Sequence, residues 1–251
     1  MNNDLITRHR GFLKDTLRKE YDFSLTDQHR GIPAPLIQKP YNPEAPRIPL
    51  LAPPEFKSSI SDTDLLTVVI GRESRRHYLP APLSLSELSF LLFSTQGIRH
   101  TPHPSVSLRT VPSAGARHSF ETYLLVRNVQ SVDPGLYRYL PLDHTLAHLG
   151  DRIPPSSVIE GCLDQRFTGE CSVTFIWTVI PYRTEWRYGP VSHKIIAIDA
   201  GHVCQNLYLA CTASGLGSCA IGAYDQDIMD TLLHLDGSDE FVIYIAPVGR
   251  M

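Results

Sequence analysis

The chain has 251 residues, of which 42% are apolar, and its formal net charge is −3. This length and apolar content favour one domain with a full hydrophobic core. The small net charge argues against a nucleic-acid or anionic-membrane partner, because basic residues cluster only in the short segment RESRR at 72–76.

The five cysteines form an odd set without CxxC spacing. The sequence therefore predicts reduced thiols, with neither a disulfide framework nor a zinc or other metal site. The first residues, MNNDLITRHRGF, lack the apolar core of a signal peptide, and no uncharged apolar run is long enough to cross a bilayer. We therefore expect a cytoplasmic protein without a membrane span.

Residues 1–60 hold many of the prolines and show little periodicity beyond a possible helix near Phe12–Tyr21. Apolar residues such as Ile48, Leu50 and Phe56 interrupt the prolines, which favours an ordered arm over a disordered leader. We expect this arm to pack on the core or on a partner subunit, with residues 61–251 forming the main domain.

Acidic residues open a predicted short helix at DTDLLTVVI, from Asp62, where they complement the helix dipole. This helix leads into Arg72, Ser74 and Arg76. Two guanidinium groups and a hydroxyl at this spacing suit recognition of an anion such as phosphate, although a solvated basic turn is the commoner meaning of such a pattern.

A capping box at Ser84 and Glu87 predicts a further helix that ends at Gly97, to which we assign no chemistry. The segment PSAGA at 112–116 is small and rigid, as a loop against a flat ring requires. The GxSxG spacing of a hydrolase is absent, and no GxGxxG follows a strand. Strands are predicted at 120–126, after the turn DPG at 133–135, and at 171–180.

The stretch from Trp186 to Gly215 is predicted to be one long helix with a single apolar stripe, closed by the glycine. Gly217 and Gly222 then allow the backbone to approach a flat ligand. Asp225 is a predicted N-cap of a helix that Gly237 closes, and a final strand ends at Arg250.

Four segments together resemble one protein family: RYG at 187–189, DAGHVCQNLYLA at 199–210, GLGSCAIGAYD at 215–225 and EFVIYIAPVGR at 240–250. Their order resembles the azoline dehydrogenases of the SagB/ThcOx type, a branch of the FMN-dependent nitroreductase superfamily, from about residue 62 to residue 250. The resemblance implies an α+β, nitroreductase-like fold, with a mixed or antiparallel central sheet between helices, in an intertwined homodimer.

The resemblance also implies a cofactor site for FMN. Arg72, Ser74, Arg76 and Arg250 would hold the phosphate. The other expected contacts are Pro112, Ser113, Ala114, Gly115, Gln205, Gly217, Ala220, Ile221 and Gly222.

Catalysis would involve the dipeptide before the long helix. Members of this family commonly have a Lys-Tyr pair there, whereas this chain has Arg187 and Tyr188. Tyr188 is a candidate base or orienting group, but Arg187 stays charged and only donates hydrogen bonds. His193 is an outside candidate for the missing base. His202 with Asp199 has metal-pair spacing without a third ligand, which favours a structural or flavin-adjacent histidine.

The predicted reaction is oxidation of a thiazoline or oxazoline ring in a peptide natural product. The substrate would be a ribosomal peptide held with a cyclodehydratase, or an intermediate tethered to a carrier protein of a peptide synthetase, met in trans. Two alternatives remain: an NAD(P)H-dependent nitro or quinone reductase, which the change to Arg187 favours, and a catalytically silent scaffold subunit of a biosynthetic complex.

Overall fold

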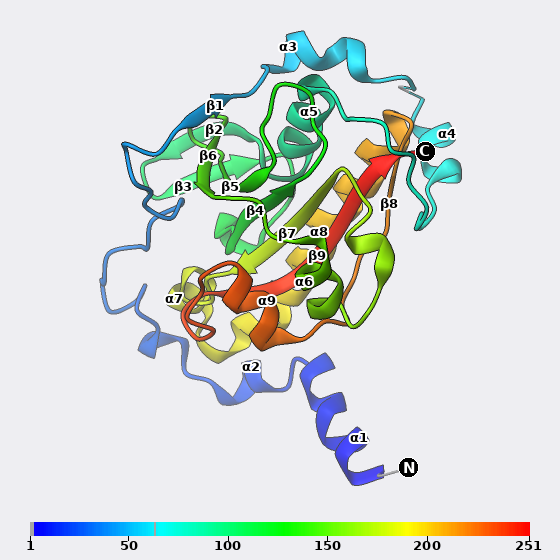
Figure 1. Ribbon diagram of the computed structural model, residues 1–251. Coiled ribbons are helices and arrows are strands. Elements are labelled where there is room, and N and C mark those ends of the chain that lie inside the picture. The colour runs from blue at the N-terminus through cyan, green and yellow to red at the C-terminus, as the bar shows by residue number, and fades with distance from the viewer. Residues whose placement is uncertain (1–2, 63) are drawn as a thin grey trace.

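The computed structural model describes residues 3–62 and 64–251. Met1 and Asn2 of the predicted arm, and Thr63 at the predicted helix opening, lie outside the described residues. A seven-stranded sheet in the order β1-β6-β5-β4-β7-β9-β8 organises the chain (Figure 1), and each neighbouring pair is antiparallel. The strands of the sheet are β1 (Arg47–Pro49), β4 (Phe120–Val126), β5 (Gly135–Leu140), β6 (Thr145–Gly150), β7 (Val173–Val179), β8 (Leu216–Ser218) and β9 (Phe241–Arg250), and a separate hairpin joins β2 (Ile98–His103) to β3 (Val106–Arg109).

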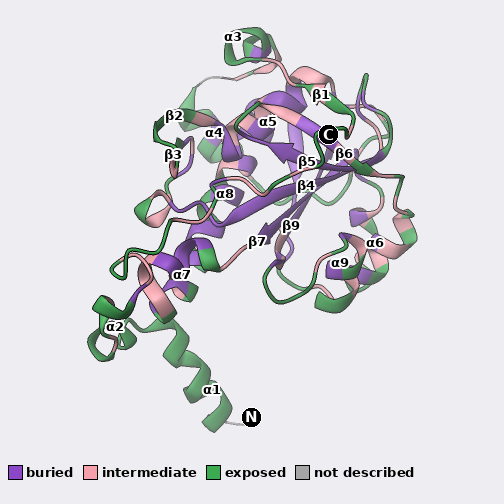
Figure 2. Cartoon of the chain, turned by 90° about the vertical axis from the view of Figure 1, so that its left-hand side faces the viewer, coloured by how far each residue is buried: buried purple, intermediate pink, exposed green. Residues whose placement is uncertain are grey.

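Helices cover both faces of this sheet, as the predicted α+β class requires. The α-helices are α1 (Asn3–Arg10), α2 (Leu17–Glu20), α3 (Pro53–Phe56), α4 (Leu65–Gly71), α5 (Leu85–Gln96), α6 (Pro155–Gly161), α7 (Tyr182–Tyr188), α8 (Ser192–Ala213) and α9 (Gln226–Leu232). Figure 2 shows α6 and α9 on the opposite side of the sheet from α8. None of these helices combines the length and the apolar run that crossing a bilayer needs.

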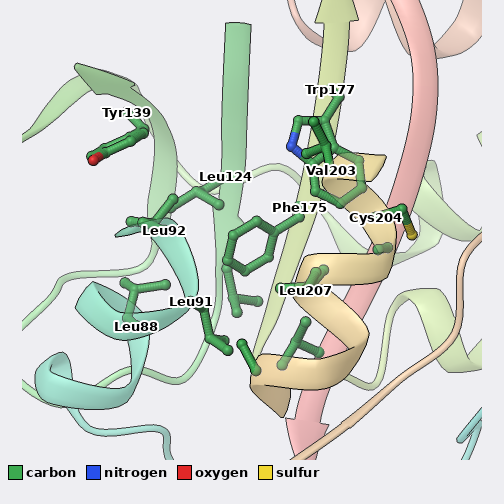
Figure 3. Packing of buried hydrophobic residues seen from close by; sticks show 14 of the residues in the cluster. Leu88, Leu91, Leu92, Leu124, Tyr139, Phe175, Trp177, Val203, Cys204 and Leu207 are labelled. Atoms are coloured by element: carbon green, nitrogen blue, oxygen red, sulfur yellow. The ribbon is translucent and has the colours of Figure 1, made fainter. Parts of the chain in front are cut away.

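The two faces of the sheet bury different side chains because successive strand residues point to opposite sides. Leu124 and Phe175 pack against Leu91 of α5 and Leu207 of α8 (Figure 3). Their neighbours on the strands, Leu125 and Ile176, belong to a second cluster, with Val158 of α6 and Met229 of α9.

The prediction of one helix from Trp186 was wrong. Helix α7 ends at Tyr188, a 3₁₀ turn spans Gly189–Val191, and α8 begins at Ser192. Gly189 adopts a φ of 54°, and Pro190 cannot donate the backbone hydrogen bond that a continuous helix requires. Tyr21 of the arm packs against this turn. The predicted closing glycine is present, since Gly215 has a φ of 66° just after α8.

Other predicted elements match more closely. Asp64 caps α4, and Ser84 with Glu87 forms the predicted capping box of α5 before Gly97. Asp225 caps α9, but that helix ends at Leu232, and Gly237 lies in the turn beyond it. The predicted helix near Phe12–Tyr21 is reduced to a 3₁₀ turn at Gly11–Leu13 and the four residues of α2.

The proline-rich segment follows the surface of this same chain. Its strand β1 pairs with β6, and Ile37 and Phe56 are buried. The backbone N–H of Lys39 donates to Glu121 (2.8 Å), while Arg138 donates to the carbonyl of Pro40 (2.8 Å). These contacts fix residues 37–49 along one side of the sheet.

Candidate functional site

Helix α8 brings the predicted site residues together. Asp199, His202, Gln205 and Tyr208 recur at intervals of three residues, so from Asp199 to Tyr208 they wind about half a turn around the helix. Gln205 and Ile198 are exposed, whereas Asp199 is buried. The nine residue steps from Asp199 to Tyr208 advance about 13 Å along the helix axis. Predicted site segments lie at both ends of this span.

Tyr208 organises the end that holds the predicted phosphate residues. Its hydroxyl lies 3.0 Å from Ser74 Oγ and accepts the backbone N–H of Ala220 at 2.7 Å. The guanidinium carbon of Arg72 lies 5.4 Å from the centre of the Tyr208 ring. A bridge between Ser74 and Ser218 holds the two segments side by side. Cation and hydroxyl therefore meet here, as an anion site needs.

The charge of Arg72 has no counter-ion within residues 3–62 and 64–251. The nearby Glu73 pairs with Arg75 instead, so this acidic neighbour does not neutralise Arg72. Arg76 also lacks an acidic partner there, but its guanidinium lies 6.0 Å from the Phe167 ring and not beside Tyr208. Arg72 and Ser74 thus share a site, and the structure gives Arg76 a different neighbour.

Arg250 makes a different contact from the one predicted for a phosphate ligand. Both of its terminal nitrogens donate to the carboxylate of Glu87, at 2.8 Å each, and one also donates to the carbonyl of Pro82 at 3.2 Å. This pair ties the end of β9 to the first turn of α5. Its role toward a phosphate stays a prediction.

The loop at 112–116 lies at the other end of the α8 span. The backbone N–H of Ala114 donates to Asp199 Oδ2 at 3.2 Å, and Ser113 Oγ accepts the N–H of His118 at 3.0 Å. Burial raises the pKa of the Asp199 carboxyl, while hydrogen bonds from Ser113 and Ala114 counteract part of that rise. Sequence reasoning gave no role to Asp199 at this loop, because the two segments are 85 residues apart.

Gly115 lies directly against the predicted catalytic pair. Its φ is 59°, and a Cβ there would come within 2.8 Å of the Tyr188 hydroxyl and 2.9 Å of Arg187 Nε. The loop and the dipeptide that ends α7 are thus in van der Waals contact. The guanidinium carbon of Arg187 also lies 5.5 Å from the Tyr188 ring centre.

The two candidate histidines, His193 and His202, contact carboxylates and not the loop at 112–116. His193 is exposed and its Nε2 lies 2.8 Å from Glu185 Oε1, beside Phe12 of the arm. His202 Nδ1 lies 3.8 Å from Asp199 Oδ1. No group of three or more potential metal ligands forms within the described chain.

The remaining predicted cofactor contacts lie on the segment after α8. Gly217 packs against Arg75 and Met251. The Ile221 N–H donates to Ile245 at 2.8 Å, which anchors this segment to β9 beside Ala220. A Cβ at Gly222 would meet no atom within 4 Å, so its surroundings are open.

Comparison with known proteins places this architecture in a family. A profile described as Nitroreductase family matches residues 69–250. A nitroreductase-like protein of Methanocaldococcus jannaschii is 34% identical over 192 residues, which cover 76% of this chain and 93% of that protein. The trifolitoxin-processing protein TfxB of Rhizobium leguminosarum bv. trifolii is 28% identical over 195 residues, or 72% of this chain, and the match spans about half (49%) of that protein.

Solved structures agree with these matches. A nitroreductase-like protein from Anabaena variabilis has a TM-score of 0.68 at 26% identity, covering 85% of this chain and 43% of that one. A chain of the E. coli microcin synthetase McbBCD complex shares the fold, with a TM-score of 0.60 at 19% identity and coverage of 90% and 91%. The chain belongs to the nitroreductase family of oxidoreductases.

Proposed function

We propose that this protein is an FMN-dependent dehydrogenase that oxidises a thiazoline or oxazoline ring in a peptide natural product. The observation that carries the proposal is the pairing of two clusters along α8. One combines Arg72 and Ser74 at Tyr208, and the other packs Gly115 against Arg187 and Tyr188. The similarity to a trifolitoxin-processing protein supports a peptide product as the substrate.

The donor set at Tyr208 fits a phosphate monoester. Arg72 supplies a permanent charge without a counter-ion in the described chain, and Ser74 supplies a hydroxyl. The small-residue loop from Pro112 to Gly115 suits a planar ring, with Gln205 exposed between the two clusters. These residues would hold FMN, which supplies a hydride acceptor when bound.

The chain's own contribution to the reaction is proton removal and orientation. Oxidation of the ring removes one hydride and one proton, and the proton leaves a weak carbon acid, so a positioned base is needed. Tyr188 is the residue that we assign to this proton, because its hydroxyl lies at the loop beside Gly115. Arg187 cannot accept the proton and would orient the substrate through its N–H groups.

A visible absorption spectrum of the purified protein, with mass identification of the released chromophore, tests the cofactor. We expect FMN near one equivalent per chain. Arg72→Ala should release FMN while preserving the fold. Arg75→Ala is the matched control, because Arg75 is already paired with Glu73. Retention of stoichiometric FMN by Arg72→Ala would refute the phosphate assignment.

Anaerobic mixing with thiazoline peptides then tests the substrate by flavin bleaching. Tyr188→Phe should keep FMN but slow this reduction, and an unchanged rate would remove Tyr188 from the mechanism. The presence of Arg187 in place of a titratable lysine favours a second function, NAD(P)H-dependent reduction of nitroaromatics or quinones. Rapid NAD(P)H oxidation with such acceptors, together with no flavin reduction by thiazoline peptides, would favour this reductase function over the dehydrogenase. A colourless protein that refuses FMN would instead indicate a silent scaffold subunit.

We also propose that the protein acts as a homodimer beside a cyclodehydratase or peptide synthetase module. Helix α4 exposes Leu65, Leu66 and Ile70, each at least 67% accessible, which supports a covered surface there. Light scattering at micromolar concentration should give twice the chain mass. A monomeric mass with full FMN content would contradict the dimer.

A further inference from the structure

A buried cation without a counter-ion lies beside the candidate catalytic pair. Arg117 is only 5% exposed. Its Nε donates to the carbonyl of Gly115 at 3.1 Å, and a terminal nitrogen donates to the carbonyl of Ser105 at 3.0 Å. Its guanidinium carbon lies 5.2 Å from the Trp186 ring centre. No carboxylate pairs with it anywhere in the part of the chain that the structure describes.

Of the other buried arginines near this region, Arg109 donates to the neutral acceptors of Ser107, Gln96 and Ile37, whereas two have a carboxylate partner. Arg183 and Arg138 both approach the buried carboxylate of Glu121, at 2.5 and 3.9 Å. A buried charge without such a partner is costly. Burial, and next the charge of Arg187, lower the pKa of Arg117. The site thus concentrates positive charge that this chain does not balance.

Arg187 is the second cation of the cluster. Its Cδ and Nε lie against Gly115, next to the Tyr188 hydroxyl. The side chain is half-buried, and it has neither an ion pair nor a hydrogen-bond acceptor among the described residues. Nearby carboxylates are engaged elsewhere, since Glu185 faces His193 and Asp199 accepts the N–H of Ala114.

We propose that Arg187, backed by the buried charge of Arg117, binds a carboxylate that the substrate carries on its reacting ring. The inference rests on the proposed function and names its substrate class: an azoline with a free carboxylate, as at the C-terminus of a peptide. A neutral amide or a carrier-bound thioester at the same position would leave both guanidinium groups without an anion. Arg187 then fixes the ring by a forked, charged contact, which a lysine provides less well.

Isothermal titration calorimetry of the protein as purified tests this carboxylate-binding site. The two ligands are benzoate and its neutral counterpart benzamide. We expect benzoate to bind at least about tenfold more tightly than benzamide, since hydrogen bonds to charged groups are the stronger ones. Arg187→Gln should weaken benzoate binding about tenfold and leave benzamide unchanged. Arg187→Lys should give an intermediate affinity, because it keeps the charge and loses the fork.

Arg152→Gln is the matched control, since Arg152 is exposed and makes no hydrogen bond or ion pair with the described residues of the site. It should bind benzoate like the parent protein. Equal affinities for benzoate and benzamide, an absence of benzoate heat, or an unchanged affinity in Arg187→Gln would each overturn the proposal.

Two further measurements distinguish a carboxylate-binding site from a role of these arginines in cofactor binding, and from the proposed dehydrogenase reaction. If Arg187→Gln shifts the flavin midpoint potential or releases FMN while benzoate binding is unchanged, the pair serves the flavin and the proposal is wrong. Benzoate titration needs no turnover, so charge-selective binding by a protein that does not oxidise thiazolines would retain the carboxylate-binding site and reject the dehydrogenase.

Discussion

Acid should destabilise this protein through one buried histidine at the candidate site. His118 is 4% exposed, and its backbone N–H holds Ser113 Oγ. Burial first, and then the charge of Arg109, lower the pKa of His118 from 6.5 to about 3. The folded protein therefore keeps the ring neutral, whereas the unfolded chain protonates it below about pH 6.5.

The sign and size of the effect follow from linkage. A depressed pKa stabilises the fold fully above the unfolded value, and that contribution is lost as the pH falls from about 6.5 toward 3. By pH 5 the loss from His118 alone should be about 2 kcal/mol.

Urea unfolding at pH 7.5 and pH 5 measures this contribution. His118→Asn removes the titration and suits the left-handed backbone at this position, where φ is 47°. The variant should lose about 2 kcal/mol less than the parent between the two pH values. His100→Asn, at an exposed position, is the control and should behave like the parent. Equal losses in the parent and His118→Asn would refute the reasoning.

Three further substitutions probe the packing described above. Gly115→Ala forces a Cβ into the Tyr188 hydroxyl at a positive φ, so we expect about 1–2 kcal/mol of destabilisation in thermal unfolding and slower flavin reduction. Phe175→Ala opens the fully buried core and should cost about 3–5 kcal/mol in urea unfolding. Glu87→Gln breaks the charged pair with Arg250 and should cost about 1–3 kcal/mol by the same assay.

Local signals in the sequence predicted the elements that local chemistry determines. The α5 capping box was predicted because Ser84 and Glu87 are three residues apart, so each side chain accepts a hydrogen bond from the backbone N–H of the other residue. The pairing of Glu87 with Arg250 was missed, because it joins residues 163 positions apart. No local sequence pattern predicts that a capping carboxylate also forms an ion pair with a distant arginine.

In the candidate site, too, local patterns were predicted and contacts between distant residues were missed. Arg72 and Ser74 were predicted as site residues from their spacing and from family resemblance, but Tyr208, which joins Ser74 to Ala220, was not. The break before α8 did have a signal, the adjacent Gly189 and Pro190, which the apolar stripe of the following helix outweighed in our interpretation. Arg117 had none, since its burial without a carboxylate partner among the described residues depends on the fold and not on a local pattern.

The edge strands of the sheet also limit how a peptide could bind to the protein. Its two outermost strands, β1 and β8, have three residues each, and Pro49 in β1 has no N–H to offer. A peptide that binds by extending a sheet needs a long row of free backbone donors and acceptors at an edge. Neither outermost strand, β1 or β8, is long enough to provide such a row. A peptide substrate would therefore be recognised through its side chains and its terminal groups, and not by joining the sheet as another strand.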